Sequence, residues 1–230
     1  SAMTHPLDKP IWTELTSRQA HFARGGAGAL CFPADVSPYA AARDDSESAV
    51  AALAKLIPLD GDISLLQRAP PRAPAGVDAT EIAGVQMILD AFPAGGRDFA
   101  IEPLGDADAA EMLALALLTK PGPFRARTHT MGRFIGVREN GRLIAMGGER
   151  LVLDGFTEVT ALCTHPDFRG RGLGEALLRA VGERIVSEGA TPFLHAYASN
   201  TGAIALYQRL GLSIRTEVTH AIWKRAAQSG

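Results

Sequence analysis

The chain has 230 residues, which is enough for one large domain or two small ones. Hydrophobic residues make up 47% of it and charged residues 21%, the balance of an ordinary globular protein. The formal net charge of −2 gives no electrostatic attraction to nucleic acid or to an anionic membrane surface, so we expect neither as a partner. Cys31 and Cys163 form no disulfide framework, and no apolar run approaches the roughly 20 residues of a membrane span, so we predict a cytoplasmic protein.

Residues 1–96 are predicted to form an α/β region with weak patterns. Asp45–Glu47 opens a predicted helix, because the apolar residues in 50–57 recur at spacings of three and four. Pro70–Pro74 breaks regular structure and is a candidate linker. Glu81–Phe92 alternates only in part, so its type stays open. This region shows no metal-ligand spacing and no nucleophile motif, and we expect no metal site.

Residues 97–230 have clearer patterns and begin with a predicted strand at Asp98–Leu104. Asp108 and Glu111 lie three apart in the run DAAE, which resembles a capping box at the start of an apolar helix. Pro121–Met131 is a predicted loop, and its charged side chains either contact the substrate or are simply solvated: Arg125, Arg127 and His129. Asn140-Gly141 is a strong hairpin signal between the two antiparallel strands that follow.

A glycine-rich turn follows the predicted strand Thr157–Thr164. The run His165–Leu178 reads HPDFRGRGLGEALL, and we expect it to lead from that turn into an amphipathic helix. Glycines let the backbone approach a ligand closely, and the start of a helix directs several unpaired N–H groups at one place. The pattern therefore favours a phosphate or pyrophosphate site, although a flexible turn without a ligand is the alternative.

The charged residues and the glycine spacing narrow this prediction. Arg169 and Arg171 would add positive charge to the site, although Arg171 can equally pair with Glu175 on the helix. A Rossmann fingerprint that starts at Gly170 would need a glycine where Glu175 stands, and no Gly-Lys-Ser/Thr of a P-loop is present. The run Arg169-x-x-Gly172-x-Gly174 instead resembles the acyl-CoA pyrophosphate loop, Arg/Gln-x-x-Gly-x-Gly/Ala, of the GNAT superfamily of N-acetyltransferases.

The resemblance extends over two blocks in the order and spacing of that family. Residues 158–178 resemble its fourth strand, loop and third helix, and residues 192–212, PFLHAYASNTGAIALYQRLGL, resemble its fifth strand and fourth helix. It implies the α/β (α+β) GNAT fold for residues 97–230, a mixed and mostly antiparallel sheet flanked by helices. Residues 1–96 resemble the N-terminal half of the glycine-N-acyltransferase-like branch, where a degenerate second GNAT-like module packs on the catalytic one.

The resemblance also implies acetyl-CoA (coenzyme A) as co-substrate, no metal, and a small amine as acceptor. A homodimer is one option for the assembly. The residues whose backbone or side chains would bind coenzyme A are Leu162, Cys163, Thr164, Arg169, Gly170, Arg171, Gly172, Leu173 and Gly174. Asn200 matches an asparagine that contacts pantetheine or pyrophosphate, and it is also placed to cap the helix that Gly211 closes.

Three residues are candidates for the chemistry. Tyr207 falls where the family's tyrosine contacts coenzyme A and protonates its sulfur, and a phenol of pKa near 10 suits a thiolate leaving group; a packing tyrosine is the alternative. Glu158 matches a glutamate that acts as base through water, against the alternative of a half-exposed strand residue. His195 is a rival base, but we expect a buried histidine whose hydrogen bonds are satisfied.

We therefore predict an N-acetyltransferase that moves an acetyl or other acyl group from its thioester to a small amine or amino acid by direct attack. Two alternatives stay open, a non-catalytic acyl-CoA-binding or regulatory module with the same fold and a protein or peptide N-acetyltransferase.

Overall fold

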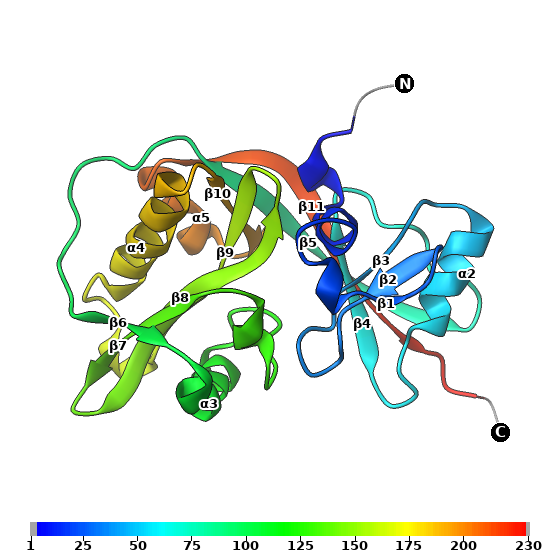
Figure 1. The fold of residues 1–230 in the computed structure, drawn as a ribbon, viewed down its shortest axis with the longest axis horizontal. Coiled ribbons are helices and arrows are strands. Elements are labelled where there is room, and N and C mark those ends of the chain that lie inside the picture. Colours follow the sequence, from blue (N-terminus) through cyan, green and yellow to red (C-terminus); the bar gives the residue numbers. More distant parts are fainter. Residues whose placement is uncertain (1–3, 229–230) are drawn as a thin grey trace.

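The computed structural model describes residues 4–228, so the outer ends of the two predicted regions, 1–3 and 229–230, lie outside it. An eight-stranded sheet in the order β4-β11-β5-β10-β9-β8-β7-β6 forms its centre (Figure 1). Its strands are β4 (Asp62–Gln67), β5 (Val77–Leu89), β6 (Ile101–Leu104), β7 (Phe134–Glu139), β8 (Arg142–Leu153), β9 (Phe156–Thr164), β10 (Thr191–Tyr197) and β11 (Leu212–Arg225). All neighbouring strands are antiparallel except β9 and β10, which confirms the predicted mixed, mostly antiparallel sheet.

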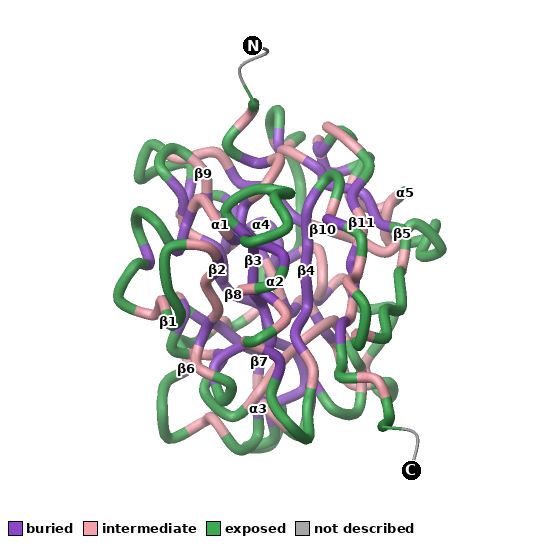
Figure 2. The backbone as a smooth tube through the Cα atoms, turned by 90° about the vertical axis from the view of Figure 1, so that its right-hand side faces the viewer, coloured by how far each residue is buried: buried purple, intermediate pink, exposed green. Residues whose placement is uncertain are grey.

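Helices cover both faces of this sheet. On one face lie α4 (Leu173–Ser187) and α5 (Thr201–Arg209), which enclose a core that includes Leu177, Val181 and Leu194. The other face is covered by α1 (Pro10–Leu15) and, beside β8 and β9, by α3 (Ala109–Thr119). A small sheet and a helix complete the N-terminal region in front of β4 (Figure 2): β1 (Arg24–Gly25), β2 (Ala29–Cys31), β3 (Ala40–Ala42) and α2 (Glu47–Lys55). No helix within residues 4–228 is both long enough and apolar enough to cross a bilayer.

The central sheet crosses the boundary predicted at residue 96. The segment left open at Glu81–Phe92 belongs to the 13-residue strand β5, which lies between β10 and β11 and pairs with both. Because β5 offers β11 a partner along its whole length, β11 is one strand of 14 residues with a register shift between Ile214 and Thr216. The two predicted regions thus share one sheet.

Local signals in the sequence are confirmed at several turns. Asn140 and Gly141 have φ of 51° and 79°, as a type I′ hairpin requires, and join β7 to β8. Asn200 caps α5 by accepting a hydrogen bond from the Ala203 N–H at 3.3 Å. The capping box predicted at Asp108 and Glu111 is wrong: no side-chain cap forms there, because both carboxylates bind Arg138, at 2.6 and 2.8 Å.

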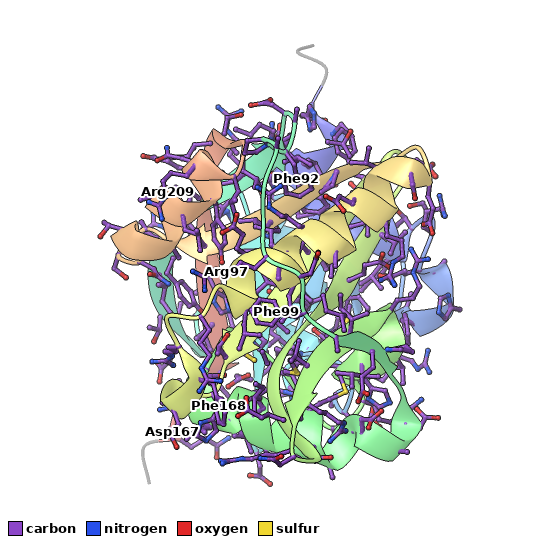
Figure 3. The ribbon with its side chains drawn as sticks, turned by 90° about the vertical axis from the view of Figure 1, so that its left-hand side faces the viewer. Phe92, Arg97, Phe99, Asp167, Phe168 and Arg209 are labelled. Carbon is purple, nitrogen blue, oxygen red and sulfur yellow. The ribbon has the colours of Figure 1, made fainter. Side chains whose placement is uncertain are left out.

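The segment that joins the two predicted regions lies across α4 (Figure 3). The ring of Phe92 lies against Gly182, where a Cβ atom would approach it to 2.5 Å. Arg179 donates from Nη1 to the carbonyl of Pro93 at 2.7 Å, and Arg97 donates to the carbonyl of Arg171 at 3.0 Å. The connection therefore reaches the glycine-rich turn at the start of α4.

Gly211 ends α5 at a position that excludes any side chain. Its φ is 93°, and a Cβ atom would lie 1.8 Å from the carbonyl oxygen of Ala91. We expect Gly211→Ala to lower the free energy of unfolding by about 3 kcal/mol or more, since backbone strain and overpacking add. Gly189→Ala is the control, because its φ of 86° is similar but its Cβ would meet nothing within 4 Å, and it should cost only about 1–2 kcal/mol. Urea denaturation measures both, and equal losses would contradict the close approach.

Candidate active site

The central sheet opens between β9 and β10. These strands pair in parallel only over Phe156–Glu158 and Thr191–Phe193, although β9 continues to Thr164. Beyond the paired part, Ala161 has a φ of 53°, and the register between β8 and β9 shifts between Gly148, opposite Thr160, and Met146, opposite Cys163. Such irregularities bend a strand away from its neighbour. The far half of β9 therefore presents an edge to an opening in the sheet.

Alternation along β9 decides which backbone groups face this opening. The N–H of His165 donates to the carbonyl of Ile144 on β8 at 2.7 Å. Because successive residues of a strand direct their polar groups to opposite edges, Cys163 also faces β8, whereas Leu162 and Thr164 face the opening. The geometry thus suits two of the three predicted backbone contacts. The prediction for Cys163 does not fit, and burial raises the pKa of its thiol to about 11.

The glycine-rich turn leaves backbone amides at the start of α4 unpaired. Gly170 and Gly172 have φ of 80° and 86°, so the turn needs glycine at both positions. No side chain caps α4, and its first internal hydrogen bond runs from the Ala176 N–H to the Gly172 carbonyl at 3.1 Å. The N–H groups of residues 173–175 precede that bond and share one end of the helix, an arrangement that binds anions.

The arginines around this turn have different partners. Arg171 pairs with Glu139 at 3.0 Å and not with Glu175, which pairs with Arg179 at 3.2 Å. Arg169 only donates to the Thr164 carbonyl at 3.4 Å, so its charge meets no carboxylate within the described residues. Arg97 adds a third guanidinium, because its side chain lies beside Gly172. Sequence reasoning missed Arg97, since it lies 74 residues from its partner Arg171 and in no motif.

A pocket lies at this opening, and its empty space, including the solvent at its open mouth, is about 750 Å³. It brings together four residues that the sequence singled out, Leu162, His195, Asn200 and Tyr207. Residues 121–123 of the predicted loop also line it, as do Ala196, Tyr197 and Ala203 from the block 192–212. The rest of its lining was not predicted and comes from both regions of the chain: Tyr39, Leu66, Gly84, Lys120, Arg150, Val218 and His220. These seven residues are far apart in sequence and belong to no motif, so no local signal marks them.

A buried ion pair lies under this pocket. Arg150 donates from Nε and Nη2 to the two carboxylate oxygens of Glu158 at 2.5 and 2.8 Å, and Nδ1 of His195 lies 2.6 Å from the same carboxylate. Burial would raise the pKa of Glu158, but the attraction of Arg150 and the bond from His195 outweigh it, and the pKa falls to about 2.

This environment corrects one of the two interpretations of Glu158, that of a half-exposed strand residue. Its side chain is 0% exposed and not half-exposed, and both of its oxygens already accept hydrogen bonds. A general base must reach the proton that it removes. Glu158 is not among the lining residues of the pocket, so its geometry suits the positioning of Arg150 and His195.

His195 is the buried histidine that the sequence analysis expected. Its side chain is 8% exposed, with Nδ1 against Glu158 and Nε2 lying 3.0 Å from Nε2 of Gln86. His220, which also lines the pocket, has Nδ1 3.3 Å from the Tyr197 hydroxyl. Burial and the charge of Arg150 lower the pKa of His220 to about 4, so it is neutral at neutral pH.

Tyr207 has the geometry of a hydrogen-bond donor toward a ligand. It lines the pocket, and its hydroxyl makes no hydrogen bond to any part of the chain that the structure describes. Burial raises its pKa, so the phenol stays protonated at neutral pH. Asn200 uses its side-chain oxygen as the α5 cap, which leaves the amide N–H groups for a ligand.

The charged side chains of the loop Pro121–Met131 join the two regions of the chain. Arg125 donates to the Ala34 carbonyl at 2.8 Å and pairs with Asp62 at 3.4 Å, and Arg127 pairs with Asp35 at 3.4 Å. Neither arginine is among the residues that line the pocket. The start of the loop, from Lys120 to Pro123, lines the pocket in their place.

Known proteins resemble both the whole chain and its C-terminal part. Residues 134–223 match the family model described as FR47-like protein. A crystal structure from Novosphingobium aromaticivorans, assigned to the GNAT family of acetyltransferases, has a TM-score of 0.91 and 37% identity, and the match covers 97% of this chain and 100% of that one.

Two curated relatives match over shorter segments. Mycothiol acetyltransferase of Corynebacterium aurimucosum is 42% identical over 72 residues, 31% of this chain and 23% of that protein. The ribosomal protein bS18-alanine N-acetyltransferase of Escherichia coli is 38% identical over 79 residues, 34% of this chain and 53% of that protein. The chain thus spans less than two thirds of the length of either relative.

A second buried carboxyl group near the ion pair predicts a pH dependence of stability. Glu14 on α1 is 0% exposed, and burial together with the charge of Glu158 holds its pKa well above its usual value. A raised folded-state pKa contributes stability that is present below the unfolded pKa and lost as pH rises through the folded one.

Glu14→Gln removes the titrating carboxyl group and with it this loss of stability at rising pH. We expect the stability of the variant, relative to the native protein, to increase in urea denaturation as the pH rises from the ordinary carboxyl range through the raised pKa of Glu14. Glu158 does not titrate in that window, because its pKa is lowered to about 2 and its contribution is lost only in acid. A stability difference that does not change with pH would contradict the assigned environment of Glu14.

Proposed function

This chain belongs to the GNAT family of acetyltransferases, and from that premise we propose that it transfers an acetyl group from acetyl-CoA to the primary amine of a small molecule. The observation that carries the proposal is the pocket at the β9–β10 opening. It joins the free edge of β9 to a tyrosine hydroxyl with no protein partner within the described residues. The helix start with unpaired amides is not part of its lining, but Arg169 connects the turn before that helix to the Thr164 carbonyl on β9. An acyl transfer needs an anchored thioester, a donor for the leaving thiolate and room for an amine.

The residues present fit acetyl-CoA, which would supply the activated acetyl group as a thioester. The amides of residues 173–175, with Arg169, would hold the pyrophosphate, and Arg97 would contribute a further positive charge. The outward-facing backbone groups of Leu162 and Thr164 would bind the pantetheine arm as a neighbouring strand does. Asn200 would donate its amide N–H groups to the same arm.

The pocket would receive the acceptor on the side opposite this cofactor. Its amine attacks the thioester carbonyl directly, and Tyr207 protonates the sulfur that leaves, a role consistent with its protonated phenol. Glu158 takes the role of a positioning residue, because it fixes Arg150 and His195 at the floor of the pocket.

Gly174 offers a test of the cofactor site that does not disturb the fold. A Cβ atom at Gly174 would meet nothing within 4 Å, and its φ lies outside the left-handed region. Gly174→Asp would place a negative charge in the first turn of α4, which stabilises a helix but repels a phosphate. We expect calorimetric titration to give an affinity for acetyl-CoA at least about tenfold lower than that of the Gly174→Ala control, with thermal stability maintained. Equal affinity of the two variants would exclude this phosphate site.

Tyr207→Phe tests the acid and separates an enzyme from a binding module. We expect kcat for thiol release, measured with a panel of primary amines, to fall by about 10²–10⁴-fold, because the thiolate loses its proton donor. The affinity for acetyl-CoA should stay within about threefold, since the ring is retained. An unchanged kcat would remove Tyr207 from the chemistry. Acetyl-CoA binding without turnover of any amine by the native protein would favour the non-catalytic alternative.

A further inference from the structure

The pocket presents hydrogen-bond donors and no carboxylate. Besides Asn200, Tyr207 and its two histidines, the lining residues Tyr39, Lys120, Arg150 and Tyr197 carry donors, and among the described residues no Asp or Glu lines it. A second ammonium group on an acceptor would find no counter-charge there. An anionic group would find several donors.

Arg150 is the donor held most firmly. Its side chain is only 7% exposed, and Nε and Nη2 are fixed by the carboxylate of Glu158. The remaining nitrogen, Nη1, makes no hydrogen bond within residues 4–228. It is absent from the unpaired polar atoms that are fully buried, so part of its surface is accessible. Since Arg150 lines the pocket, Nη1 is its atom available to a ligand.

Tyr39 places a hydroxyl next to this guanidinium. The carbon at the centre of the Arg150 guanidinium lies 4.8 Å from the centroid of the Tyr39 ring, and the tyrosine is 2% exposed. Its hydroxyl makes no hydrogen bond within residues 4–228. It is also absent from the fully buried unpaired atoms, so part of its surface is accessible. Because Tyr39 comes from the N-terminal region, that region contributes directly to the acceptor end of the pocket.

Lys120 supplies a second cation at the edge of the pocket. It ends α3 in the left-handed conformation, with a φ of 52°, and the residues after it, Pro121 to Pro123, line the pocket as well. No carboxylate of residues 4–228 forms an ion pair with Lys120, which is exposed. The two prolines restrict the backbone beside it, so the charge stays near the mouth.

Two buried carboxyl groups, Glu14 and Glu158, lie near this part of the pocket but do not line it. Glu158 pairs with Arg150, so Arg150 offers Nη1 as a hydrogen-bond donor, and the exposed Lys120 supplies the net positive charge. We propose that the acceptor is an amino acid, whose carboxylate binds Arg150 Nη1, the Tyr39 hydroxyl and Lys120 while its amine faces the opening between β9 and β10. This proposal rests on the proposed function and names its substrate class.

The reaction then balances without any further reactant. The amine nitrogen forms a bond to the acetyl carbon, the carbon–sulfur bond breaks, and the sulfur accepts a proton from Tyr207. The attacking amine is neutral, and the one proton that its nitrogen loses passes through water to the Tyr207 oxygen and restores the phenol. The products are an N-acetyl amino acid and coenzyme A with a free thiol. The carboxylate stays intact throughout and serves only for binding.

The test compares glycine, alanine and phenylalanine with their carboxamides, which retain the amine but lack the negative charge. We expect kcat/KM for thiol release from acetyl-CoA to be at least about tenfold higher for the acids, chiefly through KM. Lys120→Gln and Tyr39→Phe should each reduce this preference about three- to tenfold, and Lys120→Glu should abolish it. Lys55→Gln, an exposed lysine at the end of α2, is the control and should leave the preference unchanged.

A binding measurement separates this proposal from the proposed function. Calorimetry of the same acids and amides, in the presence of coenzyme A, reports recognition without turnover. If the acids bind more tightly than the amides, and Lys120→Gln weakens that binding, the carboxylate site is supported. Should no acetylation accompany this binding, only the proposed function fails. Equal or tighter binding of the amides overturns the carboxylate site. Turnover of the amides at the same kcat/KM as the acids also overturns it, but leaves the acetyltransferase function standing.

Discussion

The short pairing between β9 and β10 is the constraint on which the rest of the site depends. Three residue pairs hold the strands together, and beyond Glu158 the positive φ of Ala161 and the register shift against β8 between Thr160 and Cys163 direct β9 away. A complete ladder would use the outward backbone groups of Leu162 and Thr164 and close the sheet. Because the ladder stops, these groups remain available, and a pocket forms where a continuous sheet would leave none.

The ion pair of Arg150 and Glu158 supports that opening from one side. A buried pair stabilises a fold little in itself, but the removal of one partner would leave an uncompensated charge. Here the pair joins β8 to β9 and also orients His195 on β10, so it connects the strands where their backbone pairing ends. The same arrangement leaves one nitrogen of Arg150 facing the pocket, which links the packing of the sheet to the recognition of an acceptor.

The N-terminal region is part of the site as well as of the fold. It inserts β5 between β10 and β11, covers part of one sheet face with α1, and brings Tyr39 into the pocket lining. Arg125 and Arg127 connect the loop after α3 to this region, and the start of the same loop borders the pocket. The shape of the pocket therefore depends on the contact between the two regions, whereas the helix start that suits a phosphate belongs to the C-terminal region alone.

The sequence by itself determined the features that depend on neighbouring residues: the glycine-rich turn before α4, the Asn140-Gly141 hairpin, and the helix α5 that Asn200 caps and that carries Tyr207. It could not determine that Cys163 faces β8, that Arg171 pairs with Glu139, or that Arg150 forms a buried ion pair with Glu158. Tyr39 and His220 likewise reach the pocket only through the order of the strands. The physical reason is that turns and caps are stabilised within a few residues, whereas burial, register and ion pairing depend on strands that the folded sheet brings together from distant parts of the chain.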